Sequence, residues 1–172
     1  AVIPDLDKDA LLNKLENKSY VEIADNINDI QYYDILNSGV AEVEFHSVWR
    51  RIYINKQLAS HIIGYSGRDL IGLSGIEKTI PKSKILHEDI KLSIDISVQF
   101  HLEDQITKGI ELYGAESGFG IVMDANNGQI IASASLPTFD PNIINKNYAN
   151  NTVKKSTFNQ VFQGSYELGS VM

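Results

Sequence analysis

The sequence has no cysteine, few prolines and no long apolar run. Without cysteine the 172 residues can form no disulfide, no thiolate nucleophile and no cysteine-based zinc site. No stretch approaches the roughly 18 apolar residues of a membrane-spanning helix, and the first residues lack the basic start and apolar stretch of a signal peptide. An initiator methionine is also missing, so we expect an excised fragment whose address signals lie elsewhere.

Positive charge is scarce as well. The chain has 15 Lys and Arg against 22 Asp and Glu, a formal charge of -7 and a pI near 5.0. Its basic residues come only in pairs, without interleaved aromatic side chains, and its net charge repels phosphate backbones. We therefore expect no nucleic-acid partner. The apolar fraction of 43% is near the globular average, so the chain can form a core.

Metal-binding patterns are absent from the sequence. The four histidines are far apart, and none is part of a His-x-x-x-His or His-Glu-x-x-His motif: His46, His61, His87 and His101. The carboxylates show no spacing that singles out an acid/base pair. We expect neither a metal nor another cofactor.

The first half of the chain predicts two helices followed by strands. Leucine and alanine recur at helical spacing over residues 5–17, behind aspartates that can cap the start. A second helix is predicted from Val21 to Ser38, with Gly39 placed to end it in a left-handed conformation. Residues 43–45 and 51–54 alternate apolar and polar side chains, which predicts half-buried strands.

Turns and a linker separate these elements from the second half. The segment Gly64 to Gly75 has four glycines and is typical of turns. The polar stretch from Pro81 to Lys91 predicts a linker, with a module boundary near it. A helix is then predicted from Ile96 to Tyr113, capped by Asp95. Its apolar stripe has steps of four residues: Val98, Leu102, Ile106 and Ile110.

A β-hairpin is predicted over residues 120–134. Two apolar runs flank Asn127-Gly128, a pair that tolerates the positive φ angles of a tight turn. Because Ile121, Val122 and Met123 are consecutive, we expect both faces of the hairpin to be covered within a larger sheet. From the residues alone the fold class is α+β.

The segment Tyr166-Glu-Leu-Gly-Ser-Val-Met contains the candidate nucleophile, Ser170. A serine at a helix start can present its hydroxyl at the positive end of the helix dipole, although a Gly-Ser pair is more often a turn or a cap. In the Ser-x-x-Lys pattern a lysine one turn later shares the face of the serine. That lysine would be residue 173, and the chain ends at Met172.

Several segments resemble, in the same order, the class B penicillin-binding proteins. Arg51-Ile-Tyr and Leu58-Ala-Ser-His-Ile-Ile-Gly64-Tyr are similar to signatures of the non-catalytic pedestal, and Gly72-Leu-Ser-Gly75-Ile-Glu77 to its Gly-x-x-Gly-Leu/Ile-Glu motif. Further similar segments are Leu92-Ser-Ile-Asp95 with Gln99, the hairpin through Asp124 and Gly128, Pro137 to Asn142, and Tyr166 to Ser170. Ile54 and Leu168 depart from the family pattern, where proline is usual.

The resemblance implies a peptidoglycan D,D-transpeptidase that acts in cell wall synthesis. Ser170 would attack the D-Ala-D-Ala carbonyl of a stem peptide and would also react with β-lactams. The ending Glu-Leu-Gly-Ser-Val is most similar to the cell-division type, with the elongation type as the rival. The parent protein would be periplasmic or extracytoplasmic, anchored by an N-terminal membrane helix. Because the lysine, the Ser-x-Asn motif and the Lys-Thr-Gly strand are absent, we expect the fragment to be inactive.

The resemblance also implies two modules and a set of structural residues. Residues 1–90 would be an incomplete pedestal or dimerisation module, and residues 91–172 the start of the transpeptidase domain. The residues with implied structural roles are Arg51, Gly64, Gly75, Glu77, Asp95, Asp124 and Gly128. An ion pair between Arg51 and Glu77 is part of this prediction.

Two other functions remain open at this point. The segment could be a non-enzymatic module that docks division or cell-wall synthesis proteins, or a relative of β-lactam sensors and serine β-lactamases. The pedestal signatures argue against the second alternative. An unpaired edge on the 120–134 hairpin also predicts self-association, such as a homodimer of the fragment.

Overall fold

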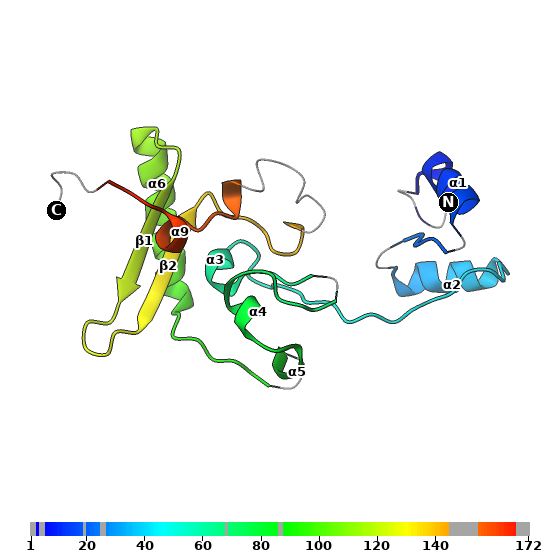
Figure 1. The fold of residues 1–172 in the computed structure, drawn as a ribbon, viewed down its shortest axis with the longest axis horizontal. Coiled ribbons are helices and arrows are strands. Elements are labelled where there is room, and N and C mark those ends of the chain that lie inside the picture. The colour runs from blue at the N-terminus through cyan, green and yellow to red at the C-terminus, as the bar shows by residue number, and fades with distance from the viewer. Residues whose placement is uncertain are drawn as a thin grey trace. The chain divides into compact units, whose positions relative to one another are not determined.

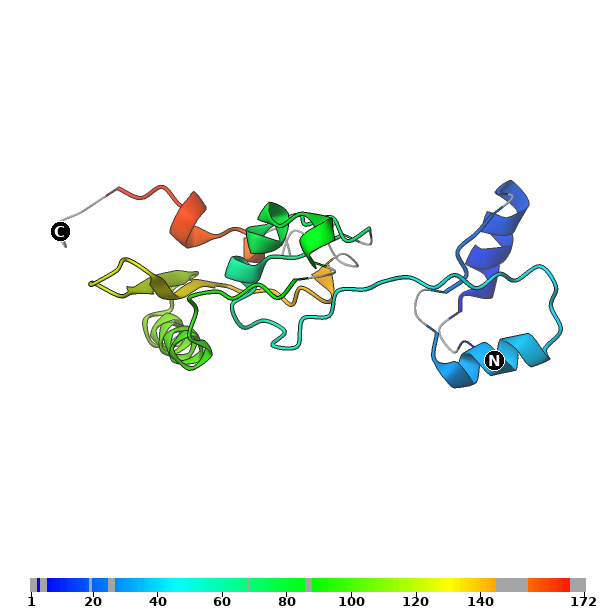
Figure 2. The same ribbon diagram turned by 90° about the horizontal axis from the view of Figure 1, so that it is seen from below.

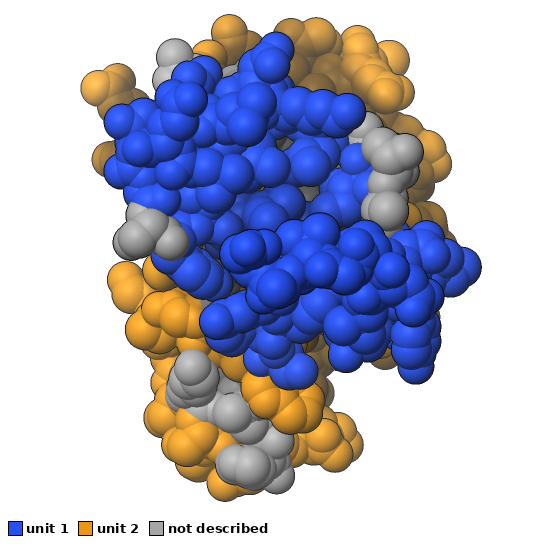
Figure 3. Space-filling model, turned by 90° about the vertical axis from the view of Figure 1, so that its right-hand side faces the viewer, with its two compact units in different colours: residues 1–47 blue, residues 48–172 orange. Residues whose placement is uncertain are grey.

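The computed structural model describes residues 3, 6–18, 20–24, 27–67, 69–85, 88–144 and 155–167. Internal contacts divide the chain into two units, residues 1–47 and 48–172, which Figure 3 colours separately. No helix in these described ranges has the length and apolar character needed to cross a bilayer. The structure combines helices with a small antiparallel sheet, which confirms an α+β composition.

The described part of the first unit contains two short helices. Helix α1 (Lys8–Asn17) begins after Asp7, whose carboxylate accepts hydrogen bonds from the backbone nitrogens of Asp9 and Ala10. Helix α2 (Asp29–Asn37) ends before Gly39, which has a φ of 70°. No described residue of this unit is buried. Its two predicted helices are present, although the second is shorter than predicted.

The start of α2 corrects the prediction that this helix begins at Val21. Asn28 and Gln31 form a reciprocal capping box, in which each side chain accepts from the backbone nitrogen of the other residue at 2.8 and 3.0 Å. Such a box satisfies two backbone donors that a helix start leaves unpaired. The helix therefore begins at the cap, and the described apolar residues between positions 21 and 27 are not helical.

The predicted strands at 43–45 and 51–54 are wrong, because both segments are irregular. At Tyr53 the reason is visible. The side-chain amide of Asn142 accepts from the Tyr53 nitrogen at 2.9 Å and donates to the Tyr53 oxygen at 3.0 Å. A side chain thus satisfies the backbone groups that a neighbouring strand would otherwise pair, and turns follow from Ile54 to Ala59.

Three short helices and a turn-rich segment occupy the next part of the chain. They are α3 (Ser60–Ile63), α4 (Gly75–Thr79) and α5 (Lys82–Ile85). Between α3 and α4 a single bridge joins Ser66 to Gly72, which fits the predicted turns. The expected linker is not wholly irregular, since α5 lies within it.

Helix α6 and a hairpin form one layer of the second unit. Helix α6 (Ile96–Tyr113) has the predicted bounds, and the Asp95 carboxylate accepts from the nitrogens of Ser97 and Val98. Strands β1 (Gly118–Met123) and β2 (Ile130–Leu136) pair antiparallel. Figures 1 and 2 show α6 along one face of the hairpin and α9 (Gln160–Gln163) on the other.

Two details of the hairpin differ from the prediction. The connection spans residues 124–129, closed by hydrogen bonds from the Asp124 nitrogen to the Gln129 oxygen and from the Gly128 nitrogen to the Asp124 oxygen. Of the Asn127-Gly128 pair only the glycine has a positive φ. In the described ranges the sheet has two strands, and Ile121 and Met123 remain 48% and 59% exposed instead of covered.

The module boundary expected near residue 90 does not coincide with the division of contacts. Residues 48–90 share a unit with α6 and the hairpin. Their link is a buried apolar cluster in which Tyr53 and Tyr65 from the earlier segment meet Phe139 and Ile144 from the later one. The boundary at residue 90 concerns the modules of the family and stays a prediction.

Candidate functional site

The predicted nucleophile, Ser170, lies outside the described residues. The part of the chain that leads to it is described as far as Glu167. Helix α9 is fixed at its start, where the Asn159 side chain accepts from the Val161 and Phe162 nitrogens. The Gln160 nitrogen donates to the Ser135 hydroxyl of β2 at 2.9 Å. Strand β2 therefore positions the approach to Ser170.

Tyr166 makes a second attachment, four residues before Ser170. Its ring stacks on Phe119 of β1, with the ring centroids 5.1 Å apart and the planes at 23°. The Tyr166 hydroxyl also donates to the Gln160 side-chain oxygen. Stacked aromatic pairs stabilise a fold by more than the burial of their apolar area alone would give. Both strands of the hairpin thus hold the segment in front of the candidate serine.

Arg51 and Glu77 form the predicted ion pair. The Arg51 Nε atom donates to Glu77 Oε1 at 2.7 Å. The Glu77 side chain is 2% exposed and that of Arg51 is 43% exposed, so the carboxylate is buried and its partner reaches solvent. The pair joins the irregular segment before Tyr53 to α4.

Gly64 and Gly75 lie against one another at the ends of α3 and α4. A Cβ atom on Gly64 would lie 1.9 Å from the Ser74 oxygen, and one on Gly75 would lie 2.6 Å from the Gly64 nitrogen. Gly64 has φ 79° and ψ -152°, a backbone region essentially restricted to glycine. Both positions therefore require glycine for two independent reasons, space and backbone angle.

Gln99 fixes α6 to β2. Its Oε1 atom accepts from the Ser133 nitrogen at 2.8 Å, and its Nε2 atom donates to the Ser133 oxygen at 3.0 Å. Nε2 also donates to Glu103, whose carboxylate accepts from the Ala59 nitrogen at 2.9 Å. Gln99 is fully buried. This chain of bonds connects the turn before α3 to the sheet.

The segment after β2 is tied to the same region. Besides the Asn142 clamp on Tyr53, the Thr138 hydroxyl lies 2.7 Å from the Ser60 hydroxyl and donates to the Gln57 oxygen. Phe139 packs edge-to-face against His61 and Tyr65. Burial lowers the pKa of His61 below its ordinary value, against the opposing effect of its hydrogen bond to the Pro137 oxygen.

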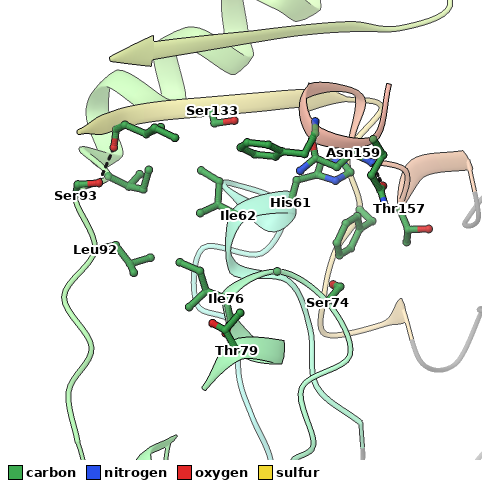
Figure 4. Close-up of a pocket in the computed structure, with 16 residues that line it drawn as sticks. His61, Ile62, Ser74, Ile76, Thr79, Leu92, Ser93, Ser133, Thr157 and Asn159 are labelled. Atoms are coloured by element: carbon green, nitrogen blue, oxygen red, sulfur yellow. Dashed lines mark hydrogen bonds between the residues drawn. The ribbon is translucent and has the colours of Figure 1, made fainter. Parts of the chain in front are cut away.

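A cavity of about 500 Å³ lies between these elements and α9 (Figure 4). Its walls come from α3 and α4, the Leu92–Ile94 segment, β2 and α9. The side chains labelled in Figure 4 include Ser93, which donates to the Ile130 oxygen at 2.7 Å, and Ser133 of β2. Among the described residues that line the cavity, His61 is the one titratable side chain. In the described ranges no group of three His, Asp or Glu side chains is placed to hold a metal ion.

The predicted residues are thus distributed over three places. Arg51, Gly64, Gly75 and Glu77 belong to the packed region from residue 51 to 79. Asp95 caps α6, and its backbone nitrogen donates to the Ile131 oxygen at 2.9 Å. Asp124 and Gly128 lie in the connection at the tip of the hairpin. Their roles in the family stay predictions.

Sequence reasoning missed the clamping roles of Asn142, Gln99 and Tyr166. For Gln99 a signal existed, because a glutamine between the stripe residues Val98 and Leu102 is a polar group on a helix that packs on a sheet. Asn142 carried no signal of its own, since its two bonds go to a backbone 89 residues earlier. In the sequence, Tyr166 is recognisable only as part of the motif that leads to Ser170.

No protein-family model matches the chain. Curated relatives do match. The probable peptidoglycan D,D-transpeptidase FtsI of Caulobacter vibrioides is 31% identical over 141 residues, 79% of this chain and 23% of the relative. The probable peptidoglycan D,D-transpeptidase PenA of Neisseria gonorrhoeae is 27% identical over 169 residues, 80% of this chain and 29% of the relative. Peptidoglycan D,D-transpeptidase FtsI of Escherichia coli K12 is 22% identical over 189 residues, which cover 95% of this chain and 31% of the relative.

The chain spans less than a third of the length of these relatives. Their matches cover 79% to 95% of this chain, and all three relatives bear the name of the same activity. The chain is therefore a relative of the class B penicillin-binding proteins, the peptidoglycan D,D-transpeptidases FtsI and PenA, over one segment of their length.

Proposed function

We propose that the protein acts, in a longer form, as a serine D,D-transpeptidase that cross-links peptidoglycan stem peptides during cell division. The Ser170 oxygen attacks the carbonyl between the two D-alanines, and the peptide C–N bond breaks. The terminal D-alanine leaves with the serine proton on its amine. A neighbouring stem-peptide amine then attacks the ester, which forms the cross-link and returns the proton to Ser170. β-Lactams acylate the same oxygen.

The main support for this proposal is the agreement between the relatives' common name and the order of the motifs. The hairpin contacts add a physical argument. A nucleophile must be held close to its productive position, and the Gln160 and Tyr166 attachments restrict the chain just before Ser170. In the same proposal residues 1–90 serve as the pedestal and residues 91–172 begin the catalytic domain.

The longer protein is proposed to work on the outer side of the cytoplasmic membrane, where peptidoglycan is cross-linked, held by an N-terminal membrane anchor. Its substrates are the stem peptides, and division or cell-wall synthesis proteins are its proposed partners. No cofactor is needed, because the serine and its proton acceptors carry out both steps.

A polypeptide of these 172 residues alone is not expected to be acylated. It contains no Ser-x-x-Lys, Ser-x-Asn or Lys-Thr-Gly sequence to supply the base, the proton relay and the oxyanion-side strand. Groups that act as a unit lose nearly all of the rate when one of them is removed. The loss is therefore expected to be close to complete.

Fluorescent-penicillin labelling followed by intact mass measurement tests the proposal. The 172-residue chain is compared with a longer polypeptide in which residues 1–172 continue into the remaining part of the Caulobacter relative. We expect one adduct on the longer polypeptide, mapped to Ser170, and none on the shorter one. Ser170→Ala in the longer polypeptide is the control and should remove the adduct.

Absence of label from a longer polypeptide that is folded by circular dichroism would overturn the transpeptidase proposal. A non-enzymatic docking module would then be the better account. Label that persists in the Ser170→Ala variant would instead reject Ser170 as the nucleophile while leaving the reaction class intact.

A further inference from the structure

The hydroxyl of Ser135 on β2 holds the backbone at the start of α9. It accepts from the Gln160 nitrogen at 2.9 Å and, over a longer 3.5 Å, donates to the Phe158 oxygen. Ser135 is 3% exposed, so water has little access to these bonds. One side chain therefore bonds both a donor and an acceptor at the start of residues 158–166, which we call the approach segment because it leads to Ser170.

Phe119, which lies opposite Ser135 in the hairpin, holds the other end of the approach segment. The two residues are paired in the antiparallel register, so their side chains lie on the same face of the sheet. The opposite face belongs to α6, since a Cβ atom on Gly120 would lie 3.2 Å from the Leu102 side chain. Helix α9 contacts both strands from the other face, where the Phe119 ring stacks on Tyr166 (Figure 1). A single cross-strand pair thus contacts the approach segment near both of its ends.

The approach segment is also closed on itself. The Tyr166 hydroxyl donates to the Gln160 side-chain oxygen, so the residue that stacks on β1 bonds the residue that is bound to β2. Gly164 permits this return of the chain, because a Cβ atom there would overlap the Gln160 oxygen and the Tyr166 ring. These contacts form a closed ring, which limits the independent movement of either end of the segment.

Strand β2 is a fixed base for these contacts. The Gln99 amide bonds both backbone groups of Ser133, two residues before Ser135. The Asp95 nitrogen donates to the oxygen of the neighbouring Ile131. Both bonds attach β2 to α6 and its cap, on the side of the strand that faces away from β1. The position of the Ser135 hydroxyl is therefore determined by α6 and the hairpin together.

The short distance along the chain from Tyr166 to Ser170 makes this attachment relevant to the reaction. Four residues of extended chain span at most about 14 Å, so a displacement of the approach segment is passed on to the serine. Misplacement of a reacting group by about 1 Å can lower a rate by on the order of a hundredfold. A contact that fixes the approach segment can thus control the rate of acylation without touching the substrate.

We propose that Ser135 is a positioning residue for the Ser170 nucleophile. Its hydroxyl sets the distance between β2 and the approach segment, and thereby the rate at which Ser170 is acylated. Ser135 acts through the backbone of Phe158 and Gln160 and contacts neither the substrate nor the reacting atoms. Loss of the hydroxyl should therefore slow acylation and leave the affinity for the ligand unchanged. The inference rests on the proposed transpeptidase function.

The time course of fluorescent-penicillin labelling tests this role in the longer polypeptide described above. Measured at several penicillin concentrations, it separates the affinity of the non-covalent complex from the maximal rate of acylation. We expect Ser135→Ala to lower the maximal rate by roughly tenfold or more at unchanged affinity. Ser135→Thr keeps a hydroxyl at this position and should retain most of the rate.

Two further variants make the test specific. Ser133→Ala is the matched control, because Ser133 is a buried serine on the same face of β2, and it should be labelled as fast as the unchanged protein. Tyr166→Phe keeps the stacked ring but removes the hydroxyl bond to Gln160. It tests the same ring of contacts from its other end and should slow acylation severalfold, even if Ser135→Ala does not fold.

Thermal unfolding of each variant separates positioning from a loss of the fold, because the rates are compared at a temperature where the proteins are folded. Full acylation rates in folded Ser135→Ala and Tyr166→Phe would reject the positioning role and leave the transpeptidase proposal intact. Equal slowing in Ser133→Ala would reject it as well, because any change on this face of β2 would then slow the reaction. No label on the unchanged longer polypeptide would remove the transpeptidase proposal itself, and this inference with it.

Discussion

Arg51 satisfies one oxygen of the Glu77 carboxylate and leaves the other unsatisfied. The Arg51 Nε atom donates to Oε1 at 2.7 Å, whereas Oε2 is buried without a hydrogen-bond partner among the described residues. A buried carboxylate with one partner depends strongly on that partner, because its loss leaves an uncompensated charge. The stability of the region from residue 51 to 79 is therefore expected to depend on this ion pair.

Replacing Arg51 by alanine should therefore destabilise the protein more than removing an exposed ion pair. We expect Arg51→Ala to lower the free energy of unfolding by about 2 kcal/mol, because Glu77 is left buried and charged. Urea unfolding measures the effect. Lys84→Ala, which removes the exposed pair with Glu88, is the matched control and should change little. The double variant Arg51→Ala/Glu77→Gln should recover part of the loss; equal losses for the single and double variants would contradict the argument.

Replacement by alanine should change the stability of the protein differently at three glycines. Gly64→Ala should lower the free energy of unfolding by at least about 3 kcal/mol, because the new Cβ would overlap the Ser74 oxygen and the Gly64 backbone angles exclude a side chain. At Gly128 a Cβ would meet open space, but the φ of 74° is unfavourable for alanine. Gly128→Ala should therefore lower the free energy of unfolding by about 1 kcal/mol. Gly109→Ala lies inside α6 with open space and should stabilise by up to about 1 kcal/mol.

Thermal unfolding followed by circular dichroism ranks these three variants. The order Gly109→Ala, Gly128→Ala, Gly64→Ala, from highest to lowest midpoint, follows from space and φ together. A Gly64→Ala variant as stable as Gly128→Ala would show that the close approach of α3 to α4 is not needed for folding.

The Gln99 clamp should be visible as a loss of protection at one amide. Gln99→Leu keeps a side chain of similar size but leaves both backbone groups of the buried Ser133 without partners, at a cost of about 3 kcal/mol. Hydrogen exchange should become faster at the Ser133 amide. Gln105→Leu changes the same residue type on an exposed position of α6 and should leave that amide protected. Unchanged exchange in Gln99→Leu would reject the clamp.

His61 predicts a dependence of stability on pH. Burial lowers its pKa below the ordinary value of 6.5, so the unfolded chain binds this proton more readily than the folded one. The stability linked to neutral His61 is then present above pH 6.5 and is lost as the pH falls from 6.5 through the folded-state pKa. Urea unfolding at a series of pH values should show this fall, and His61→Gln should remove part of it. His101→Gln, at an exposed position, should not.

Local patterns predicted the elements that depend on neighbouring residues. Helix α6 has the predicted bounds because its stripe, its Asp95 cap and the following Gly114 all act within one or two turns. The hairpin is predictable for the same reason, because two apolar runs flank a glycine. The Arg51 to Glu77 pair came from the family resemblance and not from any local pattern.

Contacts over long separations explain what could not be predicted. Residues 51–54 have strand-like alternation, yet the Tyr53 backbone bonds a side chain 89 positions later. Likewise, Gln99 uses its amide on a backbone 34 positions later. In both places a side-chain amide bonds backbone groups that a neighbouring strand would otherwise pair. The alternation of apolar residues in the sequence does not predict such a contact. The capping box of α2 was readable in principle, since Asn28 and Gln31 have the required spacing.

The connection at the hairpin tip also bears on how the protein ages chemically. Asn-Gly pairs deamidate when the glycine nitrogen attacks the asparagine side-chain carbonyl and forms a succinimide. Here the Gly128 nitrogen donates to the Asp124 oxygen at 2.8 Å, and the Asn127 side chain bonds the Asp124 carboxylate and the Gln129 nitrogen. Both reacting groups are held in place, so this turn should keep its asparagine intact for longer than the same pair in an unfolded chain.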